Sequence, residues 1–239
     1  MPTKLLIGAT CSKGWTDFLE LPVIIIGGGG HAKVLASMLL LCRRTILGFV
    51  DLNPTAPPLL GIKCLGDDNA VSLHAASDVQ LVNGIGSAQS TANRKDVYKR
   101  FTREGYGFAT VIHPLAIVAR DVQIEDGVQV MAGAILQSGS KVGSNAIINT
   151  GAIVDHDCVV GAHVHIAPGA VLSGGVRVES GAHIGTGACI IQGVFIGAAS
   201  VVGAGAVVIR DVSSGVTTVG VPAKTIGRTH AKTLDKSML

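Results

Sequence analysis

The sequence predicts a small α/β domain with a parallel sheet, followed by a solenoid of short β-strands. The first half alternates aliphatic and helical segments, with glycines directly after the aliphatic ones. In the second half an aliphatic residue recurs at every sixth position, sixteen times from Val118 to Val208. The first pattern is typical of βαβ units and the second of a repeat architecture. We therefore expect two differently built units in one chain of 239 residues.

The first unit begins with PVIIIGGGGHAK at 22–33, which predicts a buried strand, a glycine-rich turn and the start of a helix. A second apolar segment, ILGFV, ends before Asp51, and QLVNGIG at 80–86 predicts another strand that ends in a glycine turn. Parallel strands of this kind bind ligands at their carboxyl ends. The unit has room for only one mononucleotide half, so a nucleoside diphosphate is the expected ligand.

The glycine-rich turn offers candidate groups for phosphate. Gly27-x-Gly29-x-x-Ala32, followed by an acid about 20 residues on, loosely matches a dinucleotide fingerprint. Backbone N–H groups at the helix N-terminus are expected to hold the phosphates, and Asp51 to accept from a ribose or base. The expected substrate-binding residues are Gly29, Gly30, His31, Asp51, Gly86 and Ser87. A tight turn that needs glycine for packing alone is the open alternative.

The six-residue period of the second unit fits neither a helix nor a plain strand. It indicates a flat strand of a few residues, then a tight turn, with one aliphatic side chain per repeat in a shared core. Four positions after each aliphatic residue, from Val122 to Val212, stands Val, Ala, Ser or Cys, small enough to let the turn close. One repeat cannot bury its apolar side chain alone, so the repeats must stack.

Composition limits the function classes. Hydrophobic residues make up 48% of the chain, but no segment approaches the roughly 20 apolar residues of a membrane span. The formal charge of +3, without a basic run or stacking aromatics, argues against nucleic-acid binding. Five scattered cysteines without a CxxC favour free thiols in a reducing compartment. We expect a cytoplasmic protein with an N-terminal extension, residues 1–20, of unknown purpose.

Residues 117–212 resemble the hexapeptide-repeat acyltransferases, whose fold is a left-handed parallel β-helix. Together with GGGGHAK, FVD, GIGS, VIHPLA, INTGAIVDHDCVVG and VGVPAK, they make residues 22–226 similar to the PglD/NeuD-like sugar acetyltransferases. The resemblance implies a Rossmann-like domain at 21–112, the β-helix at 113–212 and a tail at 213–239. It also implies that three repeats make one coil, so positions three repeats apart stack on adjacent coils, about 4.8 Å apart as neighbouring strands are.

The same resemblance implies a reaction. The members most similar in the VDHDC segment transfer acetyl from acetyl-CoA to the 4-amino group of UDP-linked 4-amino-4,6-dideoxy sugars, such as bacillosamine precursors, in bacterial glycan synthesis. They are typically homotrimers with sites between subunits, so we expect a homotrimer that binds acetyl-CoA and a nucleotide-linked amino sugar. A sialic-acid or other sugar O-acetyltransferase, and an N-acetyltransferase for a GDP-linked amino sugar, remain alternatives within the family.

Acetyl transfer to an amine needs a base, an oxyanion donor and two aligned substrates. His156 lies between Asp155 and Asp157, two places after the inward-facing Val154, and is expected at an outward turn. By the resemblance, His156 is the base and Asp157, often Glu in the family, its partner, while Asn149 orients the substrate. Counting one full coil on from His156 gives Gly174, whose backbone N–H is the expected oxyanion donor.

Acetyl-CoA is expected to lie along the later coils. The resemblance places His165 on the acetyl-CoA side, whereas His183, one coil further on, is interpreted as structural. Lys224 and Arg228 are candidates for its phosphates, although an ordinary solvated terminus explains both charges as well. The expected acetyl-CoA residues are His165, Gly174, Thr186, Gly187, Ala188, Gly203, Ala204 and Lys224.

Two readings from other classes remain open. His163, His165 and His183 suggest a zinc hydratase of the γ-carbonic-anhydrase type, in which three imidazoles converge from adjoining subunits. That reading explains neither the nucleotide unit nor Asp157, so no metal is expected. A solenoid scaffold with a nucleotide-sensing head would spread its polar residues evenly, whereas six of them lie between Asn149 and His165. This clustering favours catalysis.

Overall fold

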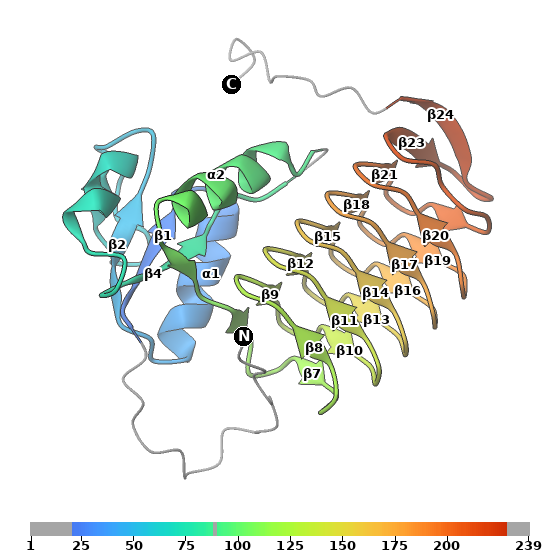
Figure 1. Ribbon diagram of the computed structural model, residues 1–239, viewed down its shortest axis with the longest axis horizontal. Helices are drawn as coiled ribbons and strands as arrows, with labels where there is room; N and C mark the ends of the chain where they lie inside the picture. The colour runs from blue at the N-terminus through green and yellow to red at the C-terminus, as the bar shows by residue number, and fades with distance from the viewer. Residues whose placement is uncertain (1–20, 88–89, 229–239) are drawn as a thin grey trace.

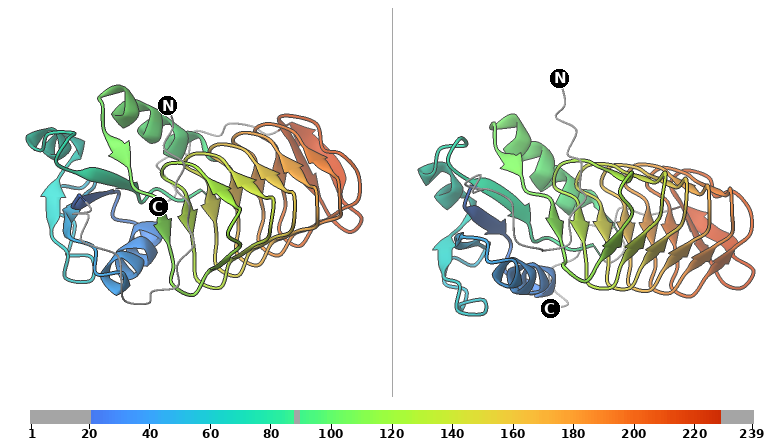
Figure 2. Two further views of the ribbon diagram at one scale, coloured as in Figure 1. Left: turned by 60° about the horizontal axis from the view of Figure 1, so that its bottom comes forward. Right: turned by 90° about the horizontal axis from the view of Figure 1, so that it is seen from below.

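The computed structural model describes residues 21–87 and 90–228, which form two units (Figure 1). An α/β unit stands against the first coils of a left-handed parallel β-helix, which extends away from it (Figures 1 and 2). The fold class expected from the sequence is therefore confirmed. The expected extension at 1–20 and the end of the expected tail, 229–239, lie outside the described residues. No helix of the described part is long and apolar enough to cross a membrane.

The α/β unit is built on a parallel five-stranded sheet of order β3-β2-β1-β4-β5. One apolar cluster packs α1 against the sheet, and a second one packs α2 and the 3₁₀ helix η1. The strand order reverses between β1 and β4, so the loops after these strands border a crevice at the carboxyl edge. The elements are β1 (Val23–Ile26), α1 (Gly30–Leu41), β2 (Ile46–Val50), β3 (Cys64–Gly66), η1 (Asp68–Leu73), β4 (Gln80–Asn83), α2 (Ala92–Arg103) and β5 (Gly107–Phe108).

The β-helix has three faces, each a sheet in which a strand pairs with the strand three repeats further along the chain. Face I consists of β7 (Ile117–Val118), β10 (Ile135–Leu136), β13 (Ile153–Val154), β16 (Val171–Leu172), β19 (Cys189–Ile190) and β22 (Val207–Val208). Face II consists of β8 (Gln123–Ile124), β11 (Lys141–Val142), β14 (Val159–Val160), β17 (Arg177–Val178) and β20 (Phe195–Ile196). Face III consists of β6 (Val111–Ile112), β9 (Gln129–Val130), β12 (Ile147–Ile148), β15 (His165–Ile166), β18 (His183–Ile184), β21 (Val201–Val202), β23 (Val216–Val219) and the antiparallel β24 (Lys224–Arg228).

Three corners join the faces, and the turns at each corner recur once per coil. Corner I–II carries the turns at 138–139, 156–157, 174–175 and 192–193. Corner II–III carries those at 126–127, 144–145, 162–163 and 180–181. Corner III–I carries those at 132–133, 150–151, 168–169, 186–187 and 204–205. Each corner of a triangular coil is opposite the remaining face, so corner I–II is opposite face III.

The period of six follows from the alternation of a two-residue strand. The second residue of each strand points into one continuous core, for example Val154, Val160 and Ile166, and the first points outward. Small residues such as Ala152 and Cys158 are also buried, at the second register where the chain turns. The second turn residue adopts positive φ and is usually glycine. The exceptions between 127 and 205 are Asn145, Asp157, His163 and Ala199.

The α/β unit covers face III at the first coils. Apolar residues of α1, including Leu35 and Met38, share one cluster with Met131 and Ile147 of the β-helix. At corner II–III the hydroxyl of Thr91 donates to the carbonyl of Gly181, at 2.9 Å. The strand β6 already pairs with β9, so the expected boundary at 112/113 falls at the end of the first solenoid strand. The covered face explains why outward residues of β9, β12, β15 and β18 are buried.

Candidate active site

His156 and Asp157 form the turn at corner I–II, where both side chains are largely exposed. His156 Nδ1 lies 2.9 Å from Asp157 Oδ2, and the backbone N–H of His156 donates to Asp155 Oδ1 at 2.8 Å. A carboxylate only accepts, so Nδ1 carries the proton and Nε2 presents a lone pair. The hydrogen bond to Asp157 and the charge of Asp155 raise the pKa of His156 above its ordinary value. This arrangement suits a general base.

Gly174 lies one coil above His156, as counting the repeats predicts. A Cβ added to Gly174 would be 2.4 Å from His156 Nε2, so only glycine leaves room for the ring. No described residue accepts a hydrogen bond from the Gly174 N–H, whereas the N–H of Gly175 donates to the carbonyl of His156 at 2.8 Å. One coil below, a Cβ on Gly139 would be 2.3 Å from Asp157 Oδ1. Glycines on both sides therefore make space for the His156–Asp157 pair.

The glycine turn of the α/β unit encloses Asp51. The Gly28 N–H donates to Asp51 Oδ2 at 2.7 Å, and the Asn53 N–H donates to Asp51 Oδ1 at 2.9 Å. Asp51 therefore supports the turn, while each of its oxygens keeps a further acceptor site. Gly29 and Gly30 are exposed at the N-terminus of α1, and a Cβ on either would meet open space. The turn can thus admit an anion beside the helix N-terminus.

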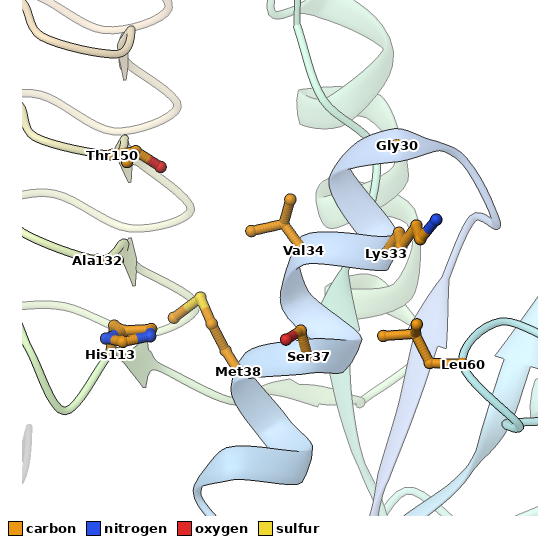
Figure 3. Close-up of a pocket in the computed structure, with 9 residues that line it drawn as sticks. All are labelled: Gly30, Lys33, Val34, Ser37, Met38, Leu60, His113, Ala132 and Thr150. Carbon is orange, nitrogen blue, oxygen red and sulfur yellow. The ribbon is translucent and has the colours of Figure 1, made fainter.

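A pocket of about 360 Å³ opens between α1 and corner III–I. Figure 3 shows Lys33, Val34 and Met38 of α1 across from His113 and Thr150 of the β-helix. The remaining lining residues are Gly30, Ser37, Leu60 and Ala132. The pocket therefore begins at the expected phosphate position and reaches the corner where the Asn149–Gly151 turn lies. Sequence reasoning did not single out Lys33 and Thr150, although both lie within recognised motifs, GGGGHAK and INTGAIVDHDCVVG.

Ser87, Asn149 and His165 meet where the α/β unit covers face III. Asn149 Nδ2 is 3.0 Å from His165 Nε2, and His165 Nδ1 is 2.6 Å from Ser87 Oγ and 3.1 Å from its carbonyl oxygen. The amide donates to Nε2, so Nδ1 carries the proton. Burial, with smaller effects from His183 and His31, lowers the pKa of His165 to about 3. His165 is thus a neutral group that links the two units.

A buried polar network joins the two units and escaped the sequence reasoning. Arg94 of α2 donates through Nη1 to the carbonyls of Asn83, at 2.7 Å, and Ile85, at 2.9 Å, and through Nε to that of Asn145 at 3.2 Å. Asn83 Nδ2 in turn donates to Asn145 Oδ1 at 3.1 Å. Burial lowers the pKa of Arg94 to about 9. The one sequence signal is Asn145, which replaces the usual turn glycine.

The expected acetyl-CoA residues lie mainly along corner III–I. The N–H groups of Gly187, Ala188 and Gly203 are bonded to other carbonyls of the solenoid, so these residues offer only carbonyl oxygens. Thr186 and Ala204 are first turn residues, and no described group accepts from their N–H. Lys224 opens β24 and is exposed. In the described chain the N–H groups of Thr186 and Ala204 therefore stay unpaired along corner III–I, a suitable lining for a long polar ligand.

The candidate residues fall into two groups that one chain does not bring together. His156, Asp157 and Gly174 lie at corner I–II, opposite face III. The second group lies on or beside face III: Gly29, Gly30, His31, Asp51, Gly86, Ser87, Asn149 and His165. Asn149, which was expected near the base, is thus on a different corner from His156. Counting repeats along the sequence leads to the same result, because Asn149 and His156 are about one six-residue repeat apart and successive repeats turn at different corners.

The histidines that suggested zinc do not converge within the described chain. His163 faces Tyr98, with ring centroids 5.5 Å apart, and Asn145, whose Nδ2 is 3.0 Å from His163 Nδ1. His165 and His183 contact each other instead, with ring centroids 5.0 Å apart. In residues 21–87 and 90–228, no group of three or more His, Cys, Asp or Glu side chains is arranged to hold a metal ion.

Comparisons with known proteins agree with both halves. Residues 22–101 match the family model of the PglD N-terminal domain, and residues 139–174 that of the bacterial transferase hexapeptide repeats. The chain belongs to the PglD-like hexapeptide-repeat sugar N-acetyltransferases. As a member it is an acyltransferase with acetyl-CoA as its co-substrate. A search of curated proteins gave no match.

Solved structures of family members are similar over most of the chain. Perosamine N-acetyltransferase from Caulobacter crescentus, solved with CoA and GDP-perosamine, is 42% identical with a TM-score of 0.81, covering 86% of this chain and 97% of that one. The acetyltransferase domain of PglB from Neisseria gonorrhoeae FA1090, solved with acetyl coenzyme A, is 34% identical with a TM-score of 0.79, covering 86% and 98%. WeeI from Acinetobacter baumannii AYE is 28% identical with a TM-score of 0.79, covering 87% and 100%.

Proposed function

We propose that this family member transfers acetyl from acetyl-CoA to the amino group of a nucleotide-linked amino sugar, with His156 as the general base. The observation that carries the proposal is the stacking of His156 beneath Gly174. It puts an imidazole lone pair beside an unpaired backbone N–H, which are the base and the oxyanion donor that aminolysis of a thioester needs.

The proton path follows from the hydrogen bonds. The uncharged amine attacks the thioester carbonyl carbon, and His156 Nε2 takes the proton that the nitrogen loses. Asp157 stabilises the imidazolium through Nδ1–H, and the Gly174 N–H donates to the oxygen on which charge develops. The C–S bond then breaks, and His156 returns the proton to the departing thiolate of CoA. Every proton is thereby accounted for by one side chain.

The α/β unit binds the nucleotide-linked substrate. Phosphates lie at the N-terminus of α1, against the backbone of Gly29 and Gly30, and Asp51 is near the nucleoside. The pocket between α1 and corner III–I has the volume for a sugar ring and leads toward Thr150. The sugar therefore points to corner III–I and away from corner I–II of the same chain.

We propose that the reaction site is completed between subunits of a homotrimer. The outward residues of face I are apolar in all six strands: Ile117, Ile135, Ile153, Val171, Cys189 and Val207. Of the five corresponding residues of face II, Gln123, Lys141 and Arg177 are polar and Val159 and Phe195 are apolar. An apolar ladder of this length is suited to packing around a threefold axis.

This arrangement would reunite the two groups of residues. Corners I–II and III–I flank face I, so a closed ring with face I inward brings corner I–II of each chain beside corner III–I of the next. His156 of one chain would then approach the sugar held by its neighbour. Acetyl-CoA would lie in the seam, where Gly174 comes from one corner and Thr186 and Ala204 from the other. A monomer in solution would contradict this proposal.

The nucleobase is the finer question. The resemblance favours UDP, while the 42% identical Caulobacter protein was solved with GDP-perosamine, which favours GDP. We propose to decide with an acetyl-CoA assay over UDP- and GDP-linked 4-amino sugars and free sialic acid. Acetylation of one nucleotide-linked amino sugar supports the proposal and identifies the nucleobase of the substrate. Turnover of sialic acid alone would replace it with O-acetylation.

A further inference from the structure

His31 lies in the first turn of α1, at the crevice between the loops that follow β1 and β4. Gly86 in the second loop is so close that a Cβ added there would be 3.2 Å from His31 Cβ. Ligands of doubly wound sheets occupy this crevice. The ring of His31 extends to the β-helix, where its Nε2 is 2.8 Å from Gln129 Oε1. His31 thus spans the path from the phosphate position to the solenoid.

The hydrogen bonds of Gln129 fix where the proton of His31 resides. Gln129 is fully buried, and its Nε2 donates to the carbonyl of Asn83 at 2.9 Å. A carbonyl only accepts, so the NH₂ group faces Asn83 and the amide oxygen faces His31. His31 Nε2 must therefore carry a hydrogen. No residue of the described chain donates to Nδ1, which is left for a group from outside the chain.

The ring is also neutral. Burial and the nearby charge of Arg94 lower the pKa of His31 to about 4, against a smaller opposite effect of the Gln129 hydrogen bond. Arg94 makes its hydrogen bonds to backbone carbonyls and has no carboxylate partner in the described chain, so its charge stays uncompensated beside the ring. A neutral imidazole protonated on Nε2 has only a lone pair on Nδ1. It accepts hydrogen bonds and repels phosphate oxygens.

We propose that His31 Nδ1 accepts a hydrogen bond from a hydroxyl group of the sugar in the nucleotide-linked substrate, and so selects that sugar. The proposal rests on the proposed function. The nucleoside lies near Asp51 at the end of β2, whereas the His31 ring extends the other way, past Gly86 toward Gln129. The phosphates are held by backbone N–H groups of the same turn. The sugar is the part of the substrate that can present a donor to Nδ1.

The test compares His31→Leu, which removes the acceptor, with His31→Asn, whose amide oxygen can replace it. His31→Leu should raise the KM for the sugar nucleotide by about tenfold, the usual value of one buried hydrogen bond, and leave the KM for acetyl-CoA unchanged. His31→Asn should recover part of the loss. An unchanged KM for the sugar nucleotide in His31→Leu would overturn the proposal. Melting temperatures within a few degrees of wild type show that both variants fold.

A series of substrate analogues, each lacking one sugar hydroxyl, identifies the donor. For one analogue the difference between wild type and His31→Leu should vanish, because the partner is already missing. The proposal is wrong if the KM difference between wild type and His31→Leu persists for every analogue. It is also wrong if the free nucleoside diphosphate, used as an inhibitor, binds the two proteins with the same difference in affinity, because His31 then contacts another part of the ligand. Wild-type turnover of the parent substrate is the control. If wild type does not turn over the parent substrate, the proposed function itself is wrong. If wild-type turnover is normal but the predicted differences for His31→Leu are missing, only the proposal for His31 is wrong.

Discussion

Gly174 and His156 face each other across adjacent coils, so closely that a methyl group on Gly174 would lie 2.4 Å from His156 Nε2. The repeat alone does not demand glycine there, since the same first turn position carries Thr186, Gln192 and Ala204 in later coils. The φ of Gly174 also lies outside the left-handed region that favours glycine. The glycine is therefore explained by the space that the His156 ring occupies.

Gly174→Ala is expected to displace the His156 ring and obstruct the oxyanion position. We expect kcat to fall by about 10²-fold or more, the usual loss when a general base no longer reaches its proton. The melting temperature should change little, because the corner is at the surface. Gln192→Ala, at the same position one coil further, is the matched control and should keep full activity. Normal kcat in Gly174→Ala would exclude Gly174 from the site.

Asp157→Asn tests the hydrogen bond to the base. Asp157 has a φ of 58°, a conformation that Asn also adopts, so the turn should persist. The carboxylate raises the pKa of His156, so its loss should lower that pKa. The acidic limb of the kcat profile, where the base becomes protonated, should move to lower pH while the maximum falls. A limb set by the substrate amine alone would not move, and that result would contradict the assignment of His156.

Gly29→Asp should weaken binding of the sugar nucleotide without lowering the stability of the protein. Gly29 is the N-cap of α1, in an extended conformation without a side-chain cap, and a Cβ there meets open space. Asp is a favoured N-cap, so the variant should be equally stable or slightly more stable, by a few tenths of a kcal/mol. The new carboxylate should repel the diphosphate and raise the KM for the sugar nucleotide by at least about tenfold. Ser72→Asp, which adds the same charge at an exposed position of η1, is the control and should leave that KM unchanged.

Mixed trimers test whether the site lies between subunits. His156→Ala keeps an intact α/β unit, and Gly29→Asp keeps an intact His156. The assay uses a sugar-nucleotide concentration well below the raised KM of Gly29→Asp, where that variant is nearly inactive. Refolding or coexpressing the two chains in equal amounts should then give about a quarter of the wild-type activity, because one in four interfaces combines two intact halves. Each variant alone, carried through the same procedure, provides the baseline. Activity no higher than that baseline would place both halves of the site in one chain.

The sequence predicts the solenoid more completely than the site. Sixteen aliphatic positions at one spacing are compatible with few folds other than a solenoid. Counting one coil along the chain correctly paired His165 with His183. The same arithmetic put Gly174 above His156. It also implies that Asn149 and His156, about one repeat apart, lie at neighbouring corners of one chain. The sequence could not show the contacts of Arg94 and Gln129, which are set by how the two units pack against each other.

The most direct test of the account is acetyl transfer to a nucleotide-linked amino sugar by wild type and His156→Ala. CoA release gives the rate, the mass of the product shows that one acetyl group is added, and resistance of that group to hydroxylamine shows an amide on nitrogen rather than an ester on oxygen. We expect N-acetylated product with wild type, and a kcat lower by about 10²–10⁴-fold in His156→Ala, with similar KM values. Near-normal turnover in His156→Ala would contradict the account.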